Sequence, residues 1–442
     1  MQEQVLYGTS VLSNPTPQIA NATVHFPGMG YSDGQSFGIS DKQIFSKHLL
    51  LLGGSGCGKT NTFLFAMNTV LNSLGADDVA IVFDTKGEFF DYFAKPGDYV
   101  IGNSPAFKDK SHTWNIFDEV LADGWADYAI FSNAREIAAA LFHGRGSESQ
   151  PFFCNAAKDL FMAMLLHFIR SAKKDPQNWM PRLNNWNLKD AFARFQGKDY
   201  LGLFKKYPDL QYMQTYIGDG TSNQALGVFG ELNSMLAEYF VGILAEHKPG
   251  QSISMRQAVR QRKGKTIFIE YDLAMGETLT PIYRLLVDQA LKEALGRTGS
   301  NAAGKCYLFA DEFKLLPKLQ HIDDALNFGR GLGVRVMAGI QSIMQLYDIY
   351  GETRGKVMAS GFGSVFGYHT NDEGSRNFLT SLMGRNMVLY QYANRLENKN
   401  EVQQREGHTL EEWTQINLGV GQAVVSLSGA DPFLYQFNEY KP

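Results

Sequence analysis

The stretch LLLLGGSGCGKTNT, Leu49–Thr62, runs four leucines directly into a glycine-rich loop that ends in Lys59 and Thr60. The loop matches the pattern G-x-x-x-x-G-K-[ST] in full, and a helical pattern follows over Thr60–Leu74. A buried strand, this loop and a helix, in that order, form the context in which the pattern binds phosphate. The stretch therefore predicts a nucleotide-binding site at the end of a buried strand.

Each residue type in the loop has a physical part in binding phosphate. Glycines let successive backbone N–H groups turn toward an anion, and the helix that follows points its positive end at it. Lys59 would add a charge for the β- and γ-phosphates, and the Thr60 hydroxyl would be a Mg²⁺ ligand. The predicted nucleotide-binding residues of the loop are Gly53, Gly54, Ser55, Gly56, Cys57, Gly58, Lys59 and Thr60.

A second apolar run, KCYLFADE over Lys305–Glu312, ends in two acids. Such a pair alone would more often cap a helix. With the phosphate loop, however, Asp311 would bind Mg²⁺ through water, and Glu312 would activate the attacking water as general base. The combination predicts ATP hydrolysis.

Further apolar runs alternate with helical patterns, among them Thr280–Leu295 and Ile322–Phe328. Short, wholly apolar strands separated by helices indicate a parallel sheet covered on both faces, so we predict a doubly wound α/β fold. The expected strands are His48–Gly54, Asp78–Asp84, Lys265–Asp272, Lys305–Glu312, Val334–Ser342, Gly363–His369 and Gly421–Gly429.

The strand pattern stops between about Gln150 and Glu246, where helical patterns such as Pro151–Lys174 take over. We interpret residues 150–246 as an all-α domain inserted into a discontinuous nucleotide-binding domain of residues 1–149 and 247–442. The polar stretch Asn394–Thr409 is predicted to be a mobile or partner-contacting connection.

Two residues near the Val334–Ser342 run are catalytic candidates. Gln341, at its end, would contact the γ-phosphate and sense its loss. Arg330, before it, would reach the site of a neighbouring subunit as an arginine finger. The alternatives are a strand-end amide and a surface arginine. Cys57, inside the loop, is either a reactive thiol or a small spacer between glycines, and we favour the spacer.

Bulk composition narrows the class of protein. The formal net charge of -4 argues against a nucleic-acid binder coated in positive charge, although a basic channel formed on assembly is compatible with it. The basic stretch Arg256–Lys265 is more simply a solvated helix end than a phosphate-binding patch.

The 3 cysteines are far apart, which argues against a disulfide framework or zinc site and fits a reducing cytoplasm. We see neither a signal peptide nor the roughly 18–20 apolar residues of a membrane span, so we expect a soluble protein.

From about His48 onward, the chain resembles the type IV coupling proteins of the TraG/TraD type, the DNA-pumping ATPases of conjugation. The motifs stand in that family's order and spacing. They are LLGGSGCGKT, VFDTKGEFFDYF, WNIFDE, FCNAAKDLF, LFADEFKLLP, GRGLGVRVMAGIQSIMQLYDIYG and TNDEGSRNFLTSLMGR.

This resemblance implies a RecA-like P-loop NTPase domain with a mostly parallel sheet, carrying an all-α domain that faces the relaxosome or an effector. It implies a homohexamer with ATP and Mg²⁺ at subunit interfaces and a central DNA channel. Lys59, Glu312, Arg330 and Gln341 fall on the family's catalytic positions, and Thr60 and Asp311 on its Mg²⁺ positions. The stretch Asp84, Lys86 and Glu88 also matches, with a less certain role.

Members of that family usually begin with two membrane-spanning helices, which this chain lacks. Either an anchor has been removed, or the protein is a soluble variant that docks on a separate membrane protein. We therefore expect a cytoplasmic protein, peripheral at the inner face of the membrane.

The leading hypothesis is an ATP-dependent coupling protein that delivers single- or double-stranded DNA, with its relaxase, to the components of a type IV secretion channel. One alternative is a nucleotide-switched receptor for protein effectors. Another is a housekeeping DNA translocase of the FtsK or HerA type.

Overall fold

The computed structural model describes residues 2–145, 151–297, 304–394 and 399–442. Contacts divide the chain into two compact units. The first comprises residues 1–98, 262–266 and 294–442, and the second comprises residues 99–261 and 267–293.

The first unit contains eight strands of the large sheet. In chain order they are β3 (Gly28–Gly30), β5 (Leu49–Leu52), β6 (Val79–Asp84), β11 (Cys306–Ala310), β12 (Val334–Ile340), β13 (Ser364–Tyr368), β16 (Gln422–Ser426) and β17 (Phe433–Phe437). Their order across the sheet is β3-β17-β16-β13-β5-β12-β11-β6. The strands from β13 to β6 are parallel, and β16, β17 and β3 continue antiparallel. The predicted α/β fold with a mostly parallel sheet is confirmed.

The four leucines of β5 explain why this strand is central. Successive side chains of a strand point to opposite faces of the sheet, and all four leucines have no exposed surface. Both faces are therefore covered, and β5 pairs in parallel with β12 on one side and β13 on the other. Its uninterrupted apolar run follows from this double burial.

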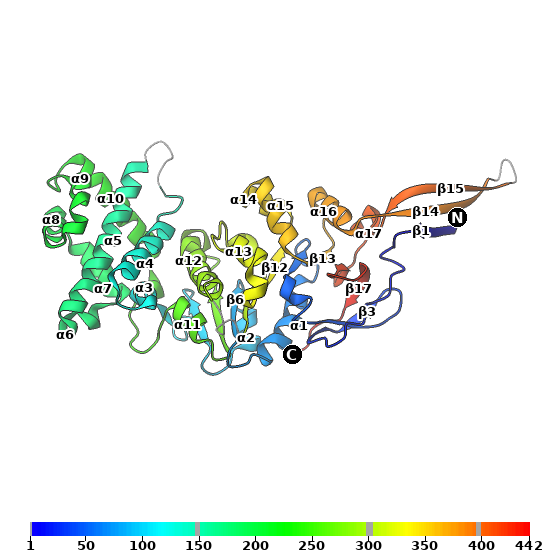
Figure 1. Ribbon diagram of the computed structural model, residues 1–442, viewed down its shortest axis with the longest axis horizontal. Helices are drawn as coiled ribbons and strands as arrows, with labels where there is room; N and C mark the ends of the chain where they lie inside the picture. The colour runs from blue at the N-terminus through cyan, green and yellow to red at the C-terminus, as the bar shows by residue number, and fades with distance from the viewer. Residues whose placement is uncertain (1, 146–150, 298–303, 395–398) are drawn as a thin grey trace. The chain divides into compact units, whose positions relative to one another are not determined.

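Helices connect and cover these strands (Figure 1). The predicted helices after the phosphate loop and before β12 are confirmed, with slightly different ends. The α-helices of this unit are α1 (Lys59–Asn72), α2 (Glu88–Phe93), α13 (Ile322–Asn327), α14 (Met344–Tyr350), α15 (Glu352–Gly361), α16 (Glu373–Met383) and α17 (Glu412–Ile416).

The prediction of a connection over Asn394–Thr409 is wrong for most of that stretch, because Lys399–His408 is strand β15. It pairs antiparallel with β14 (Arg385–Asn394), which also pairs with β1 (Gln2–Tyr7) (Figure 1). Backbone hydrogen bonds hold this small sheet, and the side chains of residues 402–406 are exposed, so the sequence shows no apolar alternation. The part of the predicted connection over residues 395–398 lies outside the described residues.

The second unit is mainly helical. All of the described residues between 151 and 246 belong to it, and they form helices and turns without a strand. It also contains β7 (Tyr99–Gly102), which pairs in parallel with β10 (Lys265–Glu270). The domain boundaries at 149/150 and 246/247 stay a prediction. The α-helices are α3 (Ile116–Val120), α4 (Asp127–Leu141), α5 (Pro151–Lys174), α6 (Pro176–Trp179), α7 (Asn185–Arg194), α8 (Gly197–Lys206), α9 (Gln214–Ile217), α10 (Asn223–Tyr239), α11 (Met255–Gln261) and α12 (Gly276–Leu295).

Helix α5 is long and apolar enough to cross a membrane by length and composition, with 24 residues and a mean hydropathy of 1.4. The structure buries 67% of that window inside the protein. Phe161, for example, stacks on Phe192 of α7 with ring centroids 5.5 Å apart. Packing against α4 and α10 accounts for the apolar composition of this core helix.

The central position of β5 predicts the effect of a truncation there. Leu50→Ala should lower the free energy of unfolding by about 2–5 kcal/mol, because it removes buried methyl groups and leaves a cavity that rigid neighbours fill poorly. Urea unfolding followed by circular dichroism measures the change. Val420→Ala, at a side chain that is 76% exposed, is the matched control and should change stability little. Equal effects of the two substitutions would contradict the central role of β5.

Candidate functional site

Four parallel neighbours of the sheet bring the candidate residues to one edge. Strands β5, β12, β11 and β6 lie side by side in that order. Because they are parallel, the residues that follow each strand meet at the same carboxyl edge, where α/β folds bind ligands. These residues are the phosphate loop, Gln341, the Asp311–Glu312 pair and the Thr85–Lys86 pair.

The start of the phosphate loop is tied to two strands of this sheet. The Gly53 N–H donates to the Ile340 carbonyl at 3.2 Å, and the Gly54 N–H donates to the His369 carbonyl at 2.8 Å. The loop then turns through Gly56 and Gly58, whose φ angles of 73° and 108° suit glycine and strain other residues. The glycine spacing that the sequence shows is thus required by the backbone.

Two residues distant in sequence brace the loop from behind. A Cβ on Gly58 would lie 3.1 Å from the Gly421 Cα, and the Gly421 N–H donates to the Cys57 carbonyl at 2.9 Å. A Cβ on Gly53 would lie 2.5 Å from the Tyr368 Cβ. Sequence reasoning missed Tyr368 and Gly421, because no local pattern connects them with the loop.

Lys59 and Thr60 begin helix α1 and have defined partners. The Lys59 ammonium donates to the carbonyls of Gly53 and Gly54 at 2.6 and 2.9 Å. The Thr60 hydroxyl donates to the Asp311 carboxylate at 2.9 Å. The two residues predicted to bind Mg²⁺ are therefore in direct contact.

The Asp311 carboxyl is buried, and burial raises its pKa above the ordinary value. The Thr60 hydrogen bond and the charge of Lys59 offset part of this effect. A buried carboxylate that is incompletely compensated favours a cation beside it. The Asp311 carboxylate and the Thr60 hydroxyl supply oxygen atoms, which are the ligands that Mg²⁺ prefers.

Glu312 has one oxygen engaged and one available. Its Oε2 accepts a hydrogen bond from the Gln341 side-chain amide at 2.7 Å. Its Oε1 is buried and accepts no hydrogen bond from the described residues, and the Lys314 ammonium lies 3.9 Å from it. The catalytic candidates Glu312 and Gln341 are thus brought together, with one carboxylate oxygen able to accept from water.

A cavity of about 330 Å³ opens over these residues, at the small end of the range for ligand sites. Of the predicted residues in the loop, Gly53, Gly54 and Cys57 do not line it. Thr85 and Lys86 also line the cavity. The sequence placed Lys86 in a stretch that matches the family, with a less certain role, and did not single out Thr85. The predicted residues that line the cavity are Ser55, Gly56, Gly58, Lys59, Thr60, Asp311, Glu312 and Gln341.

Arg330 does not line this cavity. It is exposed, in a 3₁₀ turn (Gly329–Leu332) that only Gly333 separates from the start of β12, whereas Gln341 immediately follows that strand. Seven strand residues separate the two ends of β12 by roughly 20 Å. Arg330 therefore lies at the opposite edge of the sheet from the cavity of its own chain.

Cys57 is 5% exposed, and burial raises the pKa of its thiol. A reactive cysteine needs an accessible thiolate. Burial of a protonated thiol therefore favours the interpretation of Cys57 as a spacer between glycines.

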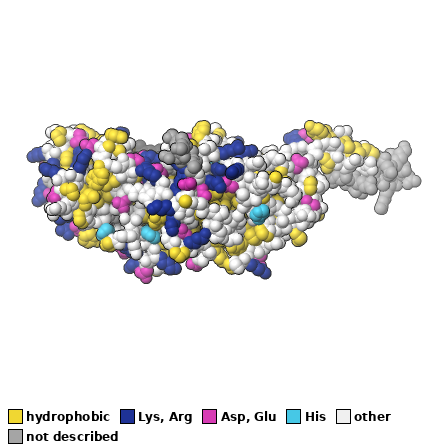
Figure 2. Space-filling view, turned by 60° about the horizontal axis from the view of Figure 1, so that its bottom comes forward, with side chains coloured by type: hydrophobic (Ala, Val, Ile, Leu, Met, Phe, Trp, Pro, Cys, Tyr) yellow, Lys and Arg dark blue, Asp and Glu magenta, His cyan; other side chains and the backbone are white. Residues whose placement is uncertain are grey.

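The basic stretch Arg256–Lys265 is neither a free phosphate-binding patch nor wholly a solvated helix end. Arg256 is 6% exposed and donates to both oxygens of Asp123 at 2.7 and 2.8 Å. Arg260 bonds the same carboxylate and Glu293. Figure 2 shows Lys and Arg side chains mixed with Asp and Glu over the face in view, without a continuous positive coat.

The segment after Gln341 links the cavity to two helices. The Ser342 hydroxyl donates to Asp372 at 2.8 Å, and the Ile343 N–H donates to the Ser375 hydroxyl at 2.9 Å. Asp372 is the N-cap of α16, and Met344 begins α14. A movement of Gln341 would therefore act on both helices at once.

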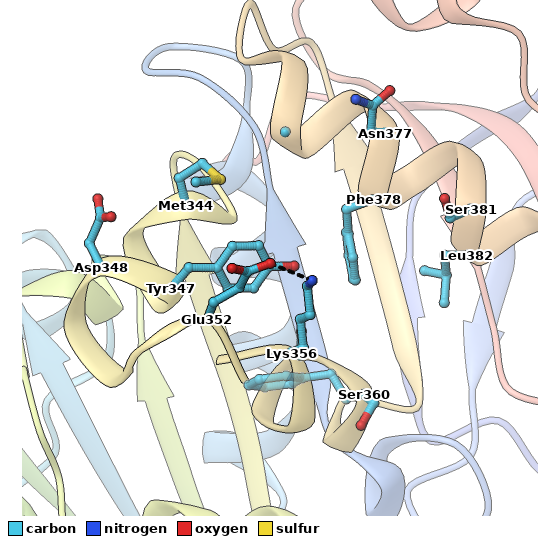
Figure 3. A pocket seen from close by; sticks show the side chains of 13 residues that line it. Met344, Tyr347, Asp348, Glu352, Lys356, Ser360, Asn377, Phe378, Ser381 and Leu382 are labelled. Carbon is cyan, nitrogen blue, oxygen red and sulfur yellow. Dashed lines mark hydrogen bonds and ion pairs between the residues drawn. The ribbon is translucent and has the colours of Figure 1, made fainter. Parts of the chain in front are cut away.

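A groove of about 990 Å³ lies beside these helices (Figure 3). Tyr347 of α14 and Phe378 of α16 line it from two sides, and the Glu352–Lys356 ion pair of α15, at 2.6 Å, lies between them in Figure 3. Met344, which lies three residues after Gln341 in the chain, is the first residue of this segment to line the groove.

A family described as the type IV secretion-system coupling protein DNA-binding domain matches residues 40–420. The chain belongs to this family. The match covers both units, so the fold and the family agree over most of the sequence.

Curated relatives support the same family. The protein VirD4 of Rhizobium radiobacter is 26% identical over 316 residues, which cover 69% of this chain and 44% of that protein. The coupling protein TraD of Escherichia coli K12 is 23% identical over 318 residues, which cover 71% of this chain and 40% of that protein. The chain thus aligns with less than half the length of either relative.

Among solved structures, the plasmid coupling protein TrwB in complex with ADP and Mg²⁺ is similar to this chain, with a TM-score of 0.69. The sequences are 18% identical, and the alignment covers 100% of this chain and 94% of that one. The likeness shows a coupling-protein fold in both units.

Replacing the buried Asp311 should raise the stability of the protein and weaken its Mg²⁺-dependent nucleotide binding. Asp311→Asn should raise the melting temperature of the ligand-free protein at neutral pH, because it removes a carboxylate whose ionised form is disfavoured by burial. The sign follows from the pKa. A carboxyl whose pKa is raised on folding destabilises the folded protein when ionised, and this cost falls as pH drops toward that pKa.

Differential scanning calorimetry from neutral to mildly acidic pH measures this effect, with the exposed Asp431→Asn as control. The gain of Asp311→Asn over the wild type should shrink as pH falls. The same substitution should weaken Mg²⁺-dependent nucleotide binding by at least about tenfold. A lower melting temperature than wild type at neutral pH would contradict this account.

Proposed function

We propose that this chain is an ATP-hydrolysing motor that recruits DNA, with a bound relaxase, and drives it into a type IV secretion channel. The observation that carries the proposal is the meeting of two pairs, Thr60 with Asp311 and Glu312 with Gln341, over one phosphate loop. The family and the similar TrwB structure with ADP and Mg²⁺ support it.

In the proposed reaction, the loop N–H groups and Lys59 bind the β- and γ-phosphates. Thr60 and Asp311 would hold a Mg²⁺ ion, which neutralises charge on the phosphates when bound. Glu312 accepts a hydrogen bond from the attacking water through Oε1 and takes its proton. The Gln341 amide, which bonds Glu312, registers departure of the γ-phosphate and passes a movement to α14 and α16.

Arg330 would act on the site of a neighbouring subunit. Its place at the opposite edge of the sheet keeps it away from its own cavity but presents it to another copy in a head-to-tail ring. We therefore propose a homohexamer with ATP sites at its interfaces and DNA, single- or double-stranded, in its channel. The helical unit would contact the relaxosome, and the assembly would sit at the inner face of the membrane, against secretion-channel components.

The motor activity predicts DNA-stimulated ATP hydrolysis. Glu312→Gln should keep ATP binding but lower the turnover number by about 10²–10⁴-fold, because it removes the base and preserves the shape. Lys59→Ala should lose both ATP binding and ATP hydrolysis. Phosphate release with Mg²⁺, with and without single- or double-stranded DNA, measures turnover.

Wild-type hydrolysis no faster than that of Lys59→Ala would overturn the motor proposal. Nucleotide binding without DNA-stimulated turnover, together with retention of effector proteins by the full chain, would favour the nucleotide-switched receptor instead.

The trans role of Arg330 predicts complementation. Arg330→Ala and Lys59→Ala should each be nearly inactive, because an arginine finger contributes about 10³–10⁵ in turnover. An equal mixture of the two should regain activity, since about a quarter of randomly formed interfaces join an intact loop to an intact Arg330. Phosphate release from mixed oligomers measures the gain.

The control mixture is Lys59→Ala with Glu312→Gln, which line the same cavity of one chain, so their mixing cannot restore a complete loop and base in any subunit. Equal activity of the two mixtures would rule out the trans role.

A further inference from the structure

The loop after β6 brings a second lysine to the nucleotide cavity. Lys86 and Thr85 line it together with Lys59, Asp311 and Glu312. Since β6 is the neighbour of β11 on the side away from β12 and β5, Lys86 borders the acids on the side opposite the phosphate loop. The two lysines therefore stand on either side of Asp311 and Glu312.

Asp84 holds this loop in a fixed conformation. Its Oδ1 accepts hydrogen bonds from the N–H groups of Lys86 and Gly87, both at 3.0 Å. Its Oδ2 accepts from those of Phe89 and Phe90 at 2.8 and 3.1 Å. Asp84 is 2% exposed, and Gly87 has the φ of 76° that the turn requires. The backbone that carries Lys86 is thus pinned by four hydrogen bonds to one buried carboxylate.

The Lys86 ammonium has no structural task of its own. Within the described residues it makes no hydrogen bond or ion pair, whereas the Lys59 ammonium is held by two carbonyls. Its charge nevertheless acts on Asp311. A long cation on a rigid loop, free at its tip and directed by its loop to a cavity, is suited to an anionic ligand.

Charge balance makes the same point. Two lysines and two carboxylates line the cavity, so it is formally neutral before any ligand binds. A magnesium nucleoside triphosphate keeps a net negative charge, and without Lys86 the cavity itself would be negative. Lys86 therefore supplies the charge that lets this acidic edge accept a triphosphate.

We propose that Lys86 is a γ-phosphate-binding residue, that it makes the site prefer a nucleoside triphosphate to a diphosphate, and that Asp84 is the positioning residue that fixes it. The proposal rests on the proposed function, ATP hydrolysis at this cavity. The γ-phosphate would project from the loop into the cavity that Glu312, Gln341 and Lys86 line together. The β-phosphate would be held by the loop itself, which follows β5, whereas Lys86 follows β6 at the other side of the acids.

The test compares binding of a non-hydrolysable ATP analogue and of ADP, each with Mg²⁺, to the 442-residue chain by titration calorimetry. Lys86→Ala should weaken binding of the triphosphate analogue by about tenfold, or 1.4 kcal/mol, and leave ADP binding unchanged. Lys86→Arg keeps the charge and should retain most of the preference. Lys42→Ala, which removes an exposed lysine outside the cavity, is the matched control and should match wild type for both nucleotides.

Asp84→Asn keeps the size of the positioning residue and weakens its hydrogen bonds, so it should lower the triphosphate preference in the same direction. Unchanged triphosphate binding in Lys86→Ala, or an equal loss for both nucleotides, would overturn the assignment of Lys86 while leaving the nucleotide site in place. Absence of binding of either nucleotide to the wild-type chain would instead overturn the proposed function and, with it, this proposal.

Discussion

The parallel pairing of β5 with β12 and β13 is the constraint on which the rest of the structure depends. It aligns the ends of neighbouring strands, so that a loop, an amide and two acids far apart in sequence meet at one edge. Burial of all four β5 leucines keeps this strand in the interior of the sheet, and the hydrogen bonds of Gly53 to Ile340 and of Gly54 to His369 fix where the phosphate loop leaves it. The positions of the site residues are therefore set by the sheet behind them.

The buried acids at the same edge lower the stability of the folded protein. Asp311 is buried with a raised pKa, and Glu312 keeps a buried oxygen without a hydrogen bond from the described residues. Buried polar groups with incomplete partners lower stability, and they are tolerated where a ligand completes them. The energy that the leucine-rich sheet contributes allows this edge to remain incompletely satisfied. Nucleotide binding would then both satisfy these groups and stabilise the fold.

Coupling to the rest of the unit follows from short hydrogen-bonded steps. Gln341 bonds Glu312, and the next two residues bond Asp372 and Ser375 at the start of α16. The first residue of this segment to line the groove, Met344, is thus three residues beyond Gln341. A two-state movement of this segment is a physical route by which the state of the nucleotide would change the surface of the unit.

The sequence by itself determined the phosphate loop, the strand-end acids, most strands of the parallel sheet and the long helices, because each depends on neighbours in the chain. Glycine spacing, an apolar run and a strand-end carboxylate are local patterns. Only the tertiary structure decided that Tyr368 and Gly421 brace the loop. It also decided that Arg256 forms an ion pair with Asp123 and that Lys399–His408 is a strand. It also brought Lys86 to the cavity and placed Arg330 at the far edge. These features depend on contacts between residues far apart in the chain, or on strand order, and neither leaves a periodic trace in the residues concerned.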